Sequence, residues 1–182
     1  MSEFHSPGDL LANVFCPGES PQKLTLITGP RGSGKTTWCR TLYQEALRCD
    51  IKPQGLISIP VFVENKKTGI DLQALPMNEC YPLATRRQNG AGYSLTRDWK
   101  FNPETVQWGN RTLSQISHTR LLILDEVGPM EFYSQGGWQT AFPLVSRRDY
   151  HWAVVVIRPA LLPQAQERWP WAEVLDVGDG VA

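Results

Sequence analysis

The sequence predicts a three-layer α/β fold with a mainly parallel sheet, and three observations lead to this prediction. Continuous apolar runs at residues 121–124 and 153–157 are typical of parallel strands that are covered on both faces. Helical patterns separate the predicted strands, as in chains where strands alternate with helices. A glycine-rich loop at residues 29–37 follows an apolar strand and opens a helix. With 182 residues, the chain is long enough for a single domain with a substantial core.

The N-terminal part is expected to contain an arm, a strand and a helix. Residues 1–22 are rich in Pro, Gly and Ser, so we expect a loose arm. Within it, an apolar patch that includes Leu10 and Leu11 suggests one helical turn that packs on the domain formed by residues 23–182. The first strand of that domain is predicted at about residues 23–28, and its helix at about residues 34–48.

The middle of the chain is expected to contribute further β structure. An apolar run covers residues 56–63, but Pro60 argues against an uninterrupted central strand there. The polar region at residues 64–101 contains short alternating segments around residues 70–75 and 93–101. We interpret these segments as inserted β-hairpins that are laid on the main sheet.

The second half begins with a well-marked helix start. Asn102 is a suitable N-cap, Pro103 suits the first helical position, and Glu104 places an acid in the first turn. This helix is expected to end at about residue 117. The other predicted elements are helices at about residues 137–146 and 161–168, and a weaker strand at about residues 174–177.

The glycine-rich loop has the composition of a phosphate-binding loop, because the pattern G-x-x-x-x-G-K-[ST] runs from Gly29 to Thr36. Glycines let consecutive backbone N–H groups approach phosphate oxygens, and the following helix N-terminus adds partial positive charge. We expect Lys35 to reach the β- and γ-phosphates of a nucleotide and the Thr36 hydroxyl to bind Mg²⁺. The residues predicted to bind the phosphates are Gly29, Pro30, Arg31, Gly32, Ser33, Gly34, Lys35, Thr36 and Thr37.

Two adjacent acids follow the apolar run at residues 121–124. Because parallel strands present ligands at their carboxyl ends, Asp125 and the phosphate loop are expected to face one crevice. Asp125 is predicted to bind Mg²⁺ directly or through water. Glu126 is predicted to orient and deprotonate an attacking water, the alternative being a solvated acid at a strand end.

The sequence DEVGPME at residues 125–131, together with residues 29–37 and 67–72, resembles the small standalone nucleoside-triphosphatase family. This family is often called the cancer-related nucleoside-triphosphatase family and includes enzymes first studied in thermophiles. The resemblance extends over about residues 23–177 and implies a RecA-like P-loop core. It also implies Mg²⁺-dependent hydrolysis of ATP, GTP, CTP and UTP with loose base selectivity. One departure is Pro129, where many members carry Lys.

Arg158 is a further candidate, based on the strand order of such folds. If residues 153–157 lie between the strand before the loop and the acidic strand, Arg158 emerges beside the γ-phosphate. There it would sense that group or stabilise transition-state charge, the alternative being a surface Arg at a strand end. No residue is an obvious arginine finger, so we expect slow intrinsic turnover. A solvated face is expected for the basic residues of the inserted region, the alternative being that one Arg approaches the phosphates; these residues are Lys66, Lys67, Arg86, Arg87, Arg97 and Lys100.

Composition excludes several other classes. The chain has 18 Lys and Arg and 18 Asp and Glu residues, so no overall field favours binding to nucleic acid or to an anionic membrane. The cysteines lack metal-ligand spacing, which favours reduced thiols, with Cys39 packed in a helix. No signal peptide or membrane-length apolar run is present, so a cytoplasmic location is expected.

Two alternative functions remain compatible with the same loop. A small-molecule kinase would transfer the γ-phosphate to an acceptor, although adjacent Asp125 and Glu126 favour activation of water. A nucleotide-gated binding module would instead use the triphosphate to order residues 64–101 for a protein partner, with hydrolysis as the reset. Release of phosphate without an acceptor separates hydrolysis from transfer.

Overall fold

The computed structural model describes residues 6–14, 22–77, 79–87, 98–134 and 136–178. These residues form an eight-stranded sheet with the order β5-β4-β3-β2-β6-β7-β1-β8. The strands are β1 (Lys23–Thr28), β2 (Gln54–Val63), β3 (Lys66–Leu75), β4 (Cys80–Arg86), β5 (Trp99–Phe101), β6 (Thr119–Val127), β7 (Tyr150–Ile157) and β8 (Glu173–Asp176).

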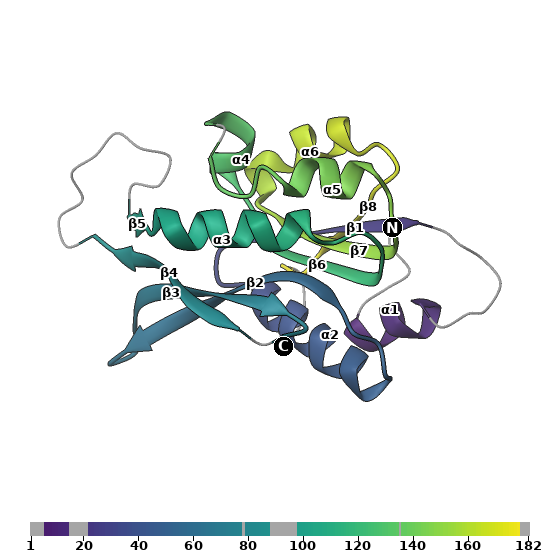
Figure 1. Ribbon diagram of the computed structural model, residues 1–182, viewed down its shortest axis with the longest axis horizontal. Coiled ribbons are helices and arrows are strands. Elements are labelled where there is room, and N and C mark those ends of the chain that lie inside the picture. The colour runs from purple at the N-terminus through teal and green to yellow at the C-terminus, as the bar shows by residue number, and fades with distance from the viewer. Residues whose placement is uncertain (1–5, 15–21, 78, 88–97, 135, 179–182) are drawn as a thin grey trace.

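Helices cover both faces of the sheet, which confirms the predicted three-layer α/β fold (Figure 1). One face carries α1 and α2, and the opposite face carries α3, α4, α5 and α6. The helices are α1 (Pro7–Val14), α2 (Lys35–Arg48), α3 (Pro103–Ser114), α4 (Pro129–Tyr133), α5 (Ala141–Ser146) and α6 (Leu162–Arg168), and a 3₁₀ turn, η1 (Pro159–Leu161), precedes α6.

The central strands are buried on both faces, which explains their continuous apolar sequences. In β6, Leu122 and Leu124 pack into the core beneath α3 and α5. Leu121 and Ile123 point the other way, into the core beneath α1 and α2. Alternate side chains of one strand therefore fill two separate cores, which gives residues 121–124 their continuous apolar sequence.

The sheet has a parallel half and an antiparallel half. Strands β2, β6, β7, β1 and β8 pair in parallel, whereas β3, β4 and β5 continue the sheet beyond β2 as an antiparallel meander. The predicted inserted hairpins are therefore present, but their strands join the edge of the sheet as further members and do not lie on its face. Part of the segment predicted at residues 93–101, residues 93–97, lies outside the described residues.

Strand β2 runs through Pro60, but this part of the strand is not central in the sheet, in agreement with the expectation from the proline. The pairing of β2 with β6 covers only Gln54 to Ile57, and only β3 is paired with the following part of the strand. Pro60 therefore lies in a segment with one unpaired edge, where the missing backbone N–H is tolerated.

The helix α1 is longer than the single turn expected in the arm. Ser6 Oγ accepts a hydrogen bond from the Asp9 backbone N–H at 3.2 Å, and Asp9 Oδ2 accepts one from the Ser6 N–H at 3.0 Å. This reciprocal pair caps the first turn. Leu10 and Leu11 are buried in the core shared with α2, which fixes the helix on the domain.

Two other helices differ from the predicted bounds. The helix that Asn102 caps begins as expected, with Asn102 Oδ1 accepting from the Glu104 N–H at 3.0 Å, but it ends at Ser114. The helix expected from residue 137 begins only at Ala141. The segment before it is held in an irregular path by side-chain hydrogen bonds, which are described below.

Gly55 provides a test of the close approach between β2 and β6. Its φ is +131°, and a Cβ at this position would overlap the carbonyl oxygen of Ile123. We expect Gly55→Ala to lower the free energy of unfolding by at least about 2 kcal/mol, measured by urea denaturation. Gly8→Ala is the matched control, because a Cβ there meets only ordinary contacts, and it should leave stability unchanged or slightly raised. Equal losses in both variants would contradict this account.

Candidate functional site

The phosphate loop connects β1 to α2 at the carboxyl edge of the parallel strands. Gly34 precedes the first residue of α2 with a φ of +89°, a left-handed conformation that favours glycine. A Cβ at Gly34 would meet nothing within 4 Å, so backbone conformation and not space accounts for the glycine. The first N–H groups of α2 are left without helical partners at this point, as in other anion-binding helix starts.

Lys35 lies within the loop that it is predicted to serve. Its ammonium donates hydrogen bonds to the carbonyl oxygens of Gly29 at 2.7 Å and Pro30 at 2.6 Å, and to Ser33 Oγ at 3.3 Å. The side chain is thus folded over the loop, where its donors meet neutral oxygens. Phosphate oxygens are stronger acceptors for an ammonium than carbonyl oxygens, so a bound triphosphate would compete for these donors.

The structure brings Thr36 and Asp125 together. Asp125 is only 3% exposed, and its Oδ2 has no hydrogen-bond partner among the described residues. Burial raises the pKa of Asp125 to about 7, although hydrogen bonding from Thr36 and the Ser58 backbone opposes this shift. A buried carboxylate oxygen without a partner beside a hydroxyl oxygen is a donor set that fits Mg²⁺, which prefers oxygen ligands.

Glu126 and Arg158 form an ion pair at the same edge. Arg158 Nε donates to Glu126 Oε1, and both side chains are partly exposed. Strand β7 lies between β1 and β6, so the strand order expected for Arg158 is confirmed. Arg158 follows the last residue of β7 and therefore emerges between the phosphate loop and the two acids. Its role in the reaction stays a prediction.

Glu131 organises the segment after Glu126, a role that our sequence analysis did not assign. Its carboxylate is 7% exposed and accepts hydrogen bonds from the backbone N–H groups of Gly128 at 2.7 Å and Trp138 at 2.6 Å. Burial raises the pKa of Glu131, and these hydrogen bonds oppose the shift. Gly128 and Glu131 are spaced as the two residues of a capping box, and this spacing in the sequence could have indicated the role of Glu131.

The basic residues of the antiparallel half do not form one solvated face. Arg86 and Arg87 are exposed, and Arg87 Nε donates to the Trp99 carbonyl oxygen at 3.2 Å. Lys66 is also exposed, but Lys67 is half-buried with its ammonium over the Trp99 ring. Lys67 therefore departs from the expected solvated face, and Arg97 lies outside the described residues.

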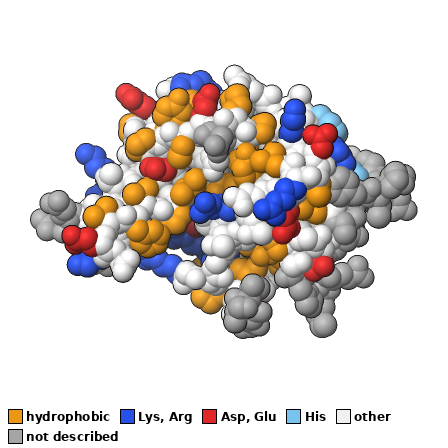
Figure 2. Space-filling view, turned by 90° about the horizontal axis from the view of Figure 1, so that it is seen from below, with side chains coloured by type: hydrophobic (Ala, Val, Ile, Leu, Met, Phe, Trp, Pro, Cys, Tyr) orange, Lys and Arg blue, Asp and Glu red, His pale blue; other side chains and the backbone are white. Residues whose placement is uncertain are grey.

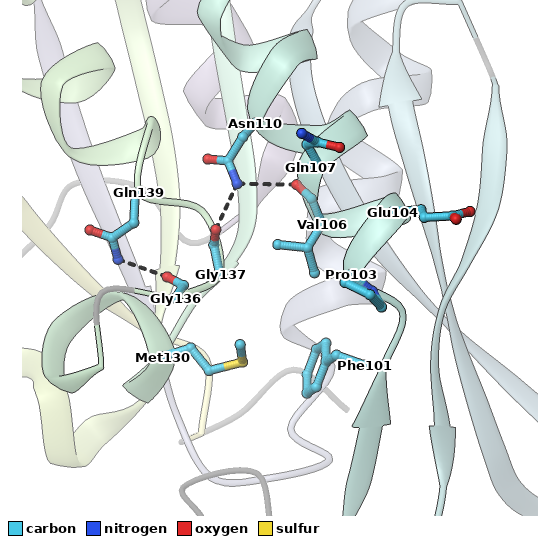
Figure 3. A pocket seen from close by; sticks show the side chains of 10 residues that line it. All are labelled: Phe101, Pro103, Glu104, Val106, Gln107, Asn110, Met130, Gly136, Gly137 and Gln139. Atoms are coloured by element: carbon cyan, nitrogen blue, oxygen red, sulfur yellow. Dashed lines mark hydrogen bonds between the residues drawn. The ribbon is translucent and has the colours of Figure 1, made fainter.

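A pocket of about 620 Å³ lies between α3 and the segment that Glu131 holds. Figure 3 shows Phe101 and Met130 facing each other across it. Asn110 Nδ2 donates to the Gly137 and Val106 carbonyl oxygens, which fixes one wall. None of the predicted site residues contributes to the lining, which consists of Phe101, Pro103, Glu104, Val106, Gln107, Asn110, Met130, Gly136, Gly137 and Gln139.

The surface shown in Figure 2 mixes charges of both signs. Lys and Arg side chains stand next to Asp and Glu side chains across this face, with hydrophobic groups between them.

Cys39 is buried, whereas Cys49 and Cys80 are exposed free thiols. Within the described ranges, no helix is long and apolar enough to cross a membrane, and no cluster of three or more His, Cys, Asp or Glu residues has metal-binding geometry.

Comparison with protein families decides the affiliation. Residues 24–160, which include the phosphate loop, the two acids and Arg158, match the family described as NTPase. The chain belongs to the NTPase family. It is therefore an enzyme that hydrolyses nucleoside triphosphates, and the resemblance identified in its sequence is confirmed.

Two solved structures share the fold of this NTPase. A human cancer-related nucleoside triphosphatase, solved in solution, superimposes with a TM-score of 0.62 at 17% identity, over 85% of this chain and 88% of that chain. THEP1 from the hyperthermophile Aquifex aeolicus gives a TM-score of 0.59 at 17% identity, over 86% of this chain and 90% of that chain. A search of curated proteins finds no match.

The two hydrogen bonds of Glu131 give a test of its structural role in the NTPase. In Glu131→Gln, the amide group replaces one acceptor by a donor, so one buried backbone N–H loses its partner. We expect the free energy of unfolding to fall by about 1–3 kcal/mol, measured by urea denaturation. Glu167→Gln, at an exposed position of α6, is the control and should change little. A variant as stable as this control would show that the two hydrogen bonds contribute nothing.

Proposed function

We propose that this NTPase hydrolyses the terminal phosphate of Mg²⁺-bound nucleoside triphosphates at the edge formed by β1, β7 and β6. The observation that carries the proposal is the contact between Thr36, at the start of the phosphate loop helix, and the buried Asp125 of β6. Phosphate-binding and metal-binding groups are thereby within reach of one ligand. Lys35 and the backbone N–H groups of residues 29–37 would bind the phosphate oxygens.

Thr36 and Asp125 would hold the divalent cation. The open oxygen of Asp125 and the Thr36 hydroxyl supply the oxygen ligands, and water and phosphate oxygens would complete the coordination. Mg²⁺, when bound, neutralises charge on the phosphate oxygens. The buried carboxyl of Asp125 carries its negative charge at a cost, which a bound cation offsets.

Glu126 is proposed to activate water. Its carboxylate would accept a proton from a water molecule as the water oxygen attacks the γ-phosphorus, and the bond to the bridging oxygen of the diphosphate breaks. Arg158 is hydrogen-bonded to this carboxylate in the structure. A γ-phosphate would compete for the guanidinium, and the exchange would free Glu126 to face water while Arg158 stabilises charge on the phosphate.

Loose selectivity among ATP, GTP, CTP and UTP follows from the chemistry of these groups. Lys35, Thr36, Asp125, Glu126 and Arg158 all address the triphosphate and its cation, which the four substrates share. The family resemblance supports the same breadth. Phosphate release from the four nucleotides, without any added acceptor, tests hydrolysis against transfer to an acceptor.

Substitutions of Lys35 and of Glu126 are expected to affect different steps, nucleotide binding in the first case and turnover in the second. Lys35→Ala removes a charged donor and should weaken binding of a non-hydrolysable ATP analogue at least about tenfold. Glu126→Gln should keep binding and lower turnover about 10²–10⁴-fold, because only proton transfer is lost. Titration and colorimetric phosphate release measure the two effects, with the exposed Lys52→Ala as control. Wild-type turnover in Glu126→Gln would remove the proposed base.

The metal ligands predict dependence on a divalent cation. Chelation of divalent ions should abolish phosphate release, and addition of Mg²⁺ should restore it, because phosphate charge is otherwise uncompensated. Asp125→Asn should raise the Mg²⁺ concentration needed for half-maximal rate, measured by Mg²⁺ titration at saturating ATP. Full activity in the presence of excess chelator would contradict this assignment.

A further inference from the structure

Strand β3 carries one lysine toward the site and its neighbour away from it. Successive side chains of a strand point to opposite faces, so Lys66 and Lys67 diverge. Lys66 is exposed, whereas Lys67 is half-buried with its Nζ 5.3 Å from the centroid of the Trp99 ring. The ring faces the ammonium with its negative quadrupole and favours a defined position for the charge.

The start of β5 links this lysine to the phosphate loop. Asp98 Oδ2 lies 4.0 Å from the Arg31 guanidinium of the loop, and the next residue, Trp99, contacts Lys67. The Arg87 backbone N–H donates to the Asp98 carbonyl oxygen at 3.0 Å, which ties β5 to the end of β4. The antiparallel half of the sheet thus reaches the phosphate loop at the point where Lys67 lies.

The electrostatic surroundings of Lys67 are those of the predicted site. Burial lowers the pKa of Lys67, and the guanidinium groups of Arg31 and Arg158 lower it further. The carboxylates of Glu126 and Asp125 oppose that shift. Three cations from three separate elements therefore converge near two acids. Mutual repulsion among cations is relieved when a multivalent anion binds between them.

We propose that Lys67 is a further catalytic residue, which binds the γ-phosphate and stabilises negative charge on its oxygens during hydrolysis. This inference rests on the proposed function. Lys67 would supply a cation from the antiparallel half of the sheet, and our sequence analysis did not assign this residue to the site. Since Lys67 addresses the terminal phosphate, it contributes to binding of a triphosphate and not to binding of a diphosphate.

The alternative is a purely structural lysine that holds β3 against Trp99. A cation–π contact of this kind contributes about 0.5–1 kcal/mol at exposed sites, and its loss would lower stability without a specific effect on phosphate. The two roles differ in their response to the length of the phosphate chain. They also differ in whether another cation at residue 67 restores the rate.

The test compares Lys67→Met, which removes the charge and keeps an apolar stem, with Lys67→Arg, which keeps a cation. Lys66→Met is the matched control on the opposite face of the same strand. Turnover with Mg²⁺ and ATP should fall about 10²–10³-fold in Lys67→Met. The ratio of affinities for a non-hydrolysable ATP analogue and for ADP should fall as well. Lys67→Arg should recover most of the rate, and Lys66→Met should match the wild type.

The inference is overturned if wild type hydrolyses ATP and Lys67→Met does so equally well with an unchanged affinity ratio. It is also overturned if Lys67→Met and Lys67→Arg lose activity equally and both melt at lower temperature, which indicates a structural role. If the wild type releases no phosphate from any triphosphate, the proposed function fails. The affinity ratio still tests in that case whether Lys67 binds the terminal phosphate.

Discussion

Parallel pairing of β7 between β1 and β6 is the constraint on which the site depends. Ile27 pairs with Val156, and Val127 with Ile157, so three strands end at one edge of the sheet. Each strand delivers a different kind of group there: a glycine-rich turn, an arginine, and a pair of acids. The apolar residues that precede these groups anchor them, because they are buried in the two cores and a slip of one residue would carry each side chain to the opposite core.

Charge distribution gives this edge its chemistry. The buried Asp125 carboxyl lacks a partner on one oxygen, while cations lie on the loop, after β7 and on β3. The arginines are paired with acids, Arg158 with Glu126 and Arg31 with Asp98, but this oxygen of Asp125 has no hydrogen-bond partner among the described residues. Protein interiors rarely leave such groups without a ligand, since an uncompensated buried charge destabilises the fold. This arrangement supports the proposed ligand, which carries several negative charges together with a divalent cation.

The sequence predicted the parallel half of the fold better than the antiparallel half. Residues 121–124 and 153–157 are covered on both faces, and burial of that kind leaves a continuous apolar pattern. In strand β4 only the consecutive residues Leu83 and Ala84 are buried, and the strand includes Pro82, so its sequence pattern was weak. The motif residues Lys35 and Asp125 lie where their spacing implied. Lys67 could not be placed, because its position depends on pairing across β3, β4 and β5, which local sequence does not determine.

Lys67 and Arg31 repel each other across the boundary between the antiparallel extension and the phosphate loop. In the proposed site, the γ-phosphate of a nucleoside triphosphate would attract both groups, whereas the diphosphate that remains after hydrolysis would carry less charge at that position. Attraction between the two elements is therefore stronger before the reaction than after it. If the γ-phosphate binds between these cations as proposed, their mutual repulsion is relieved while the triphosphate is bound and returns once the terminal phosphate has left.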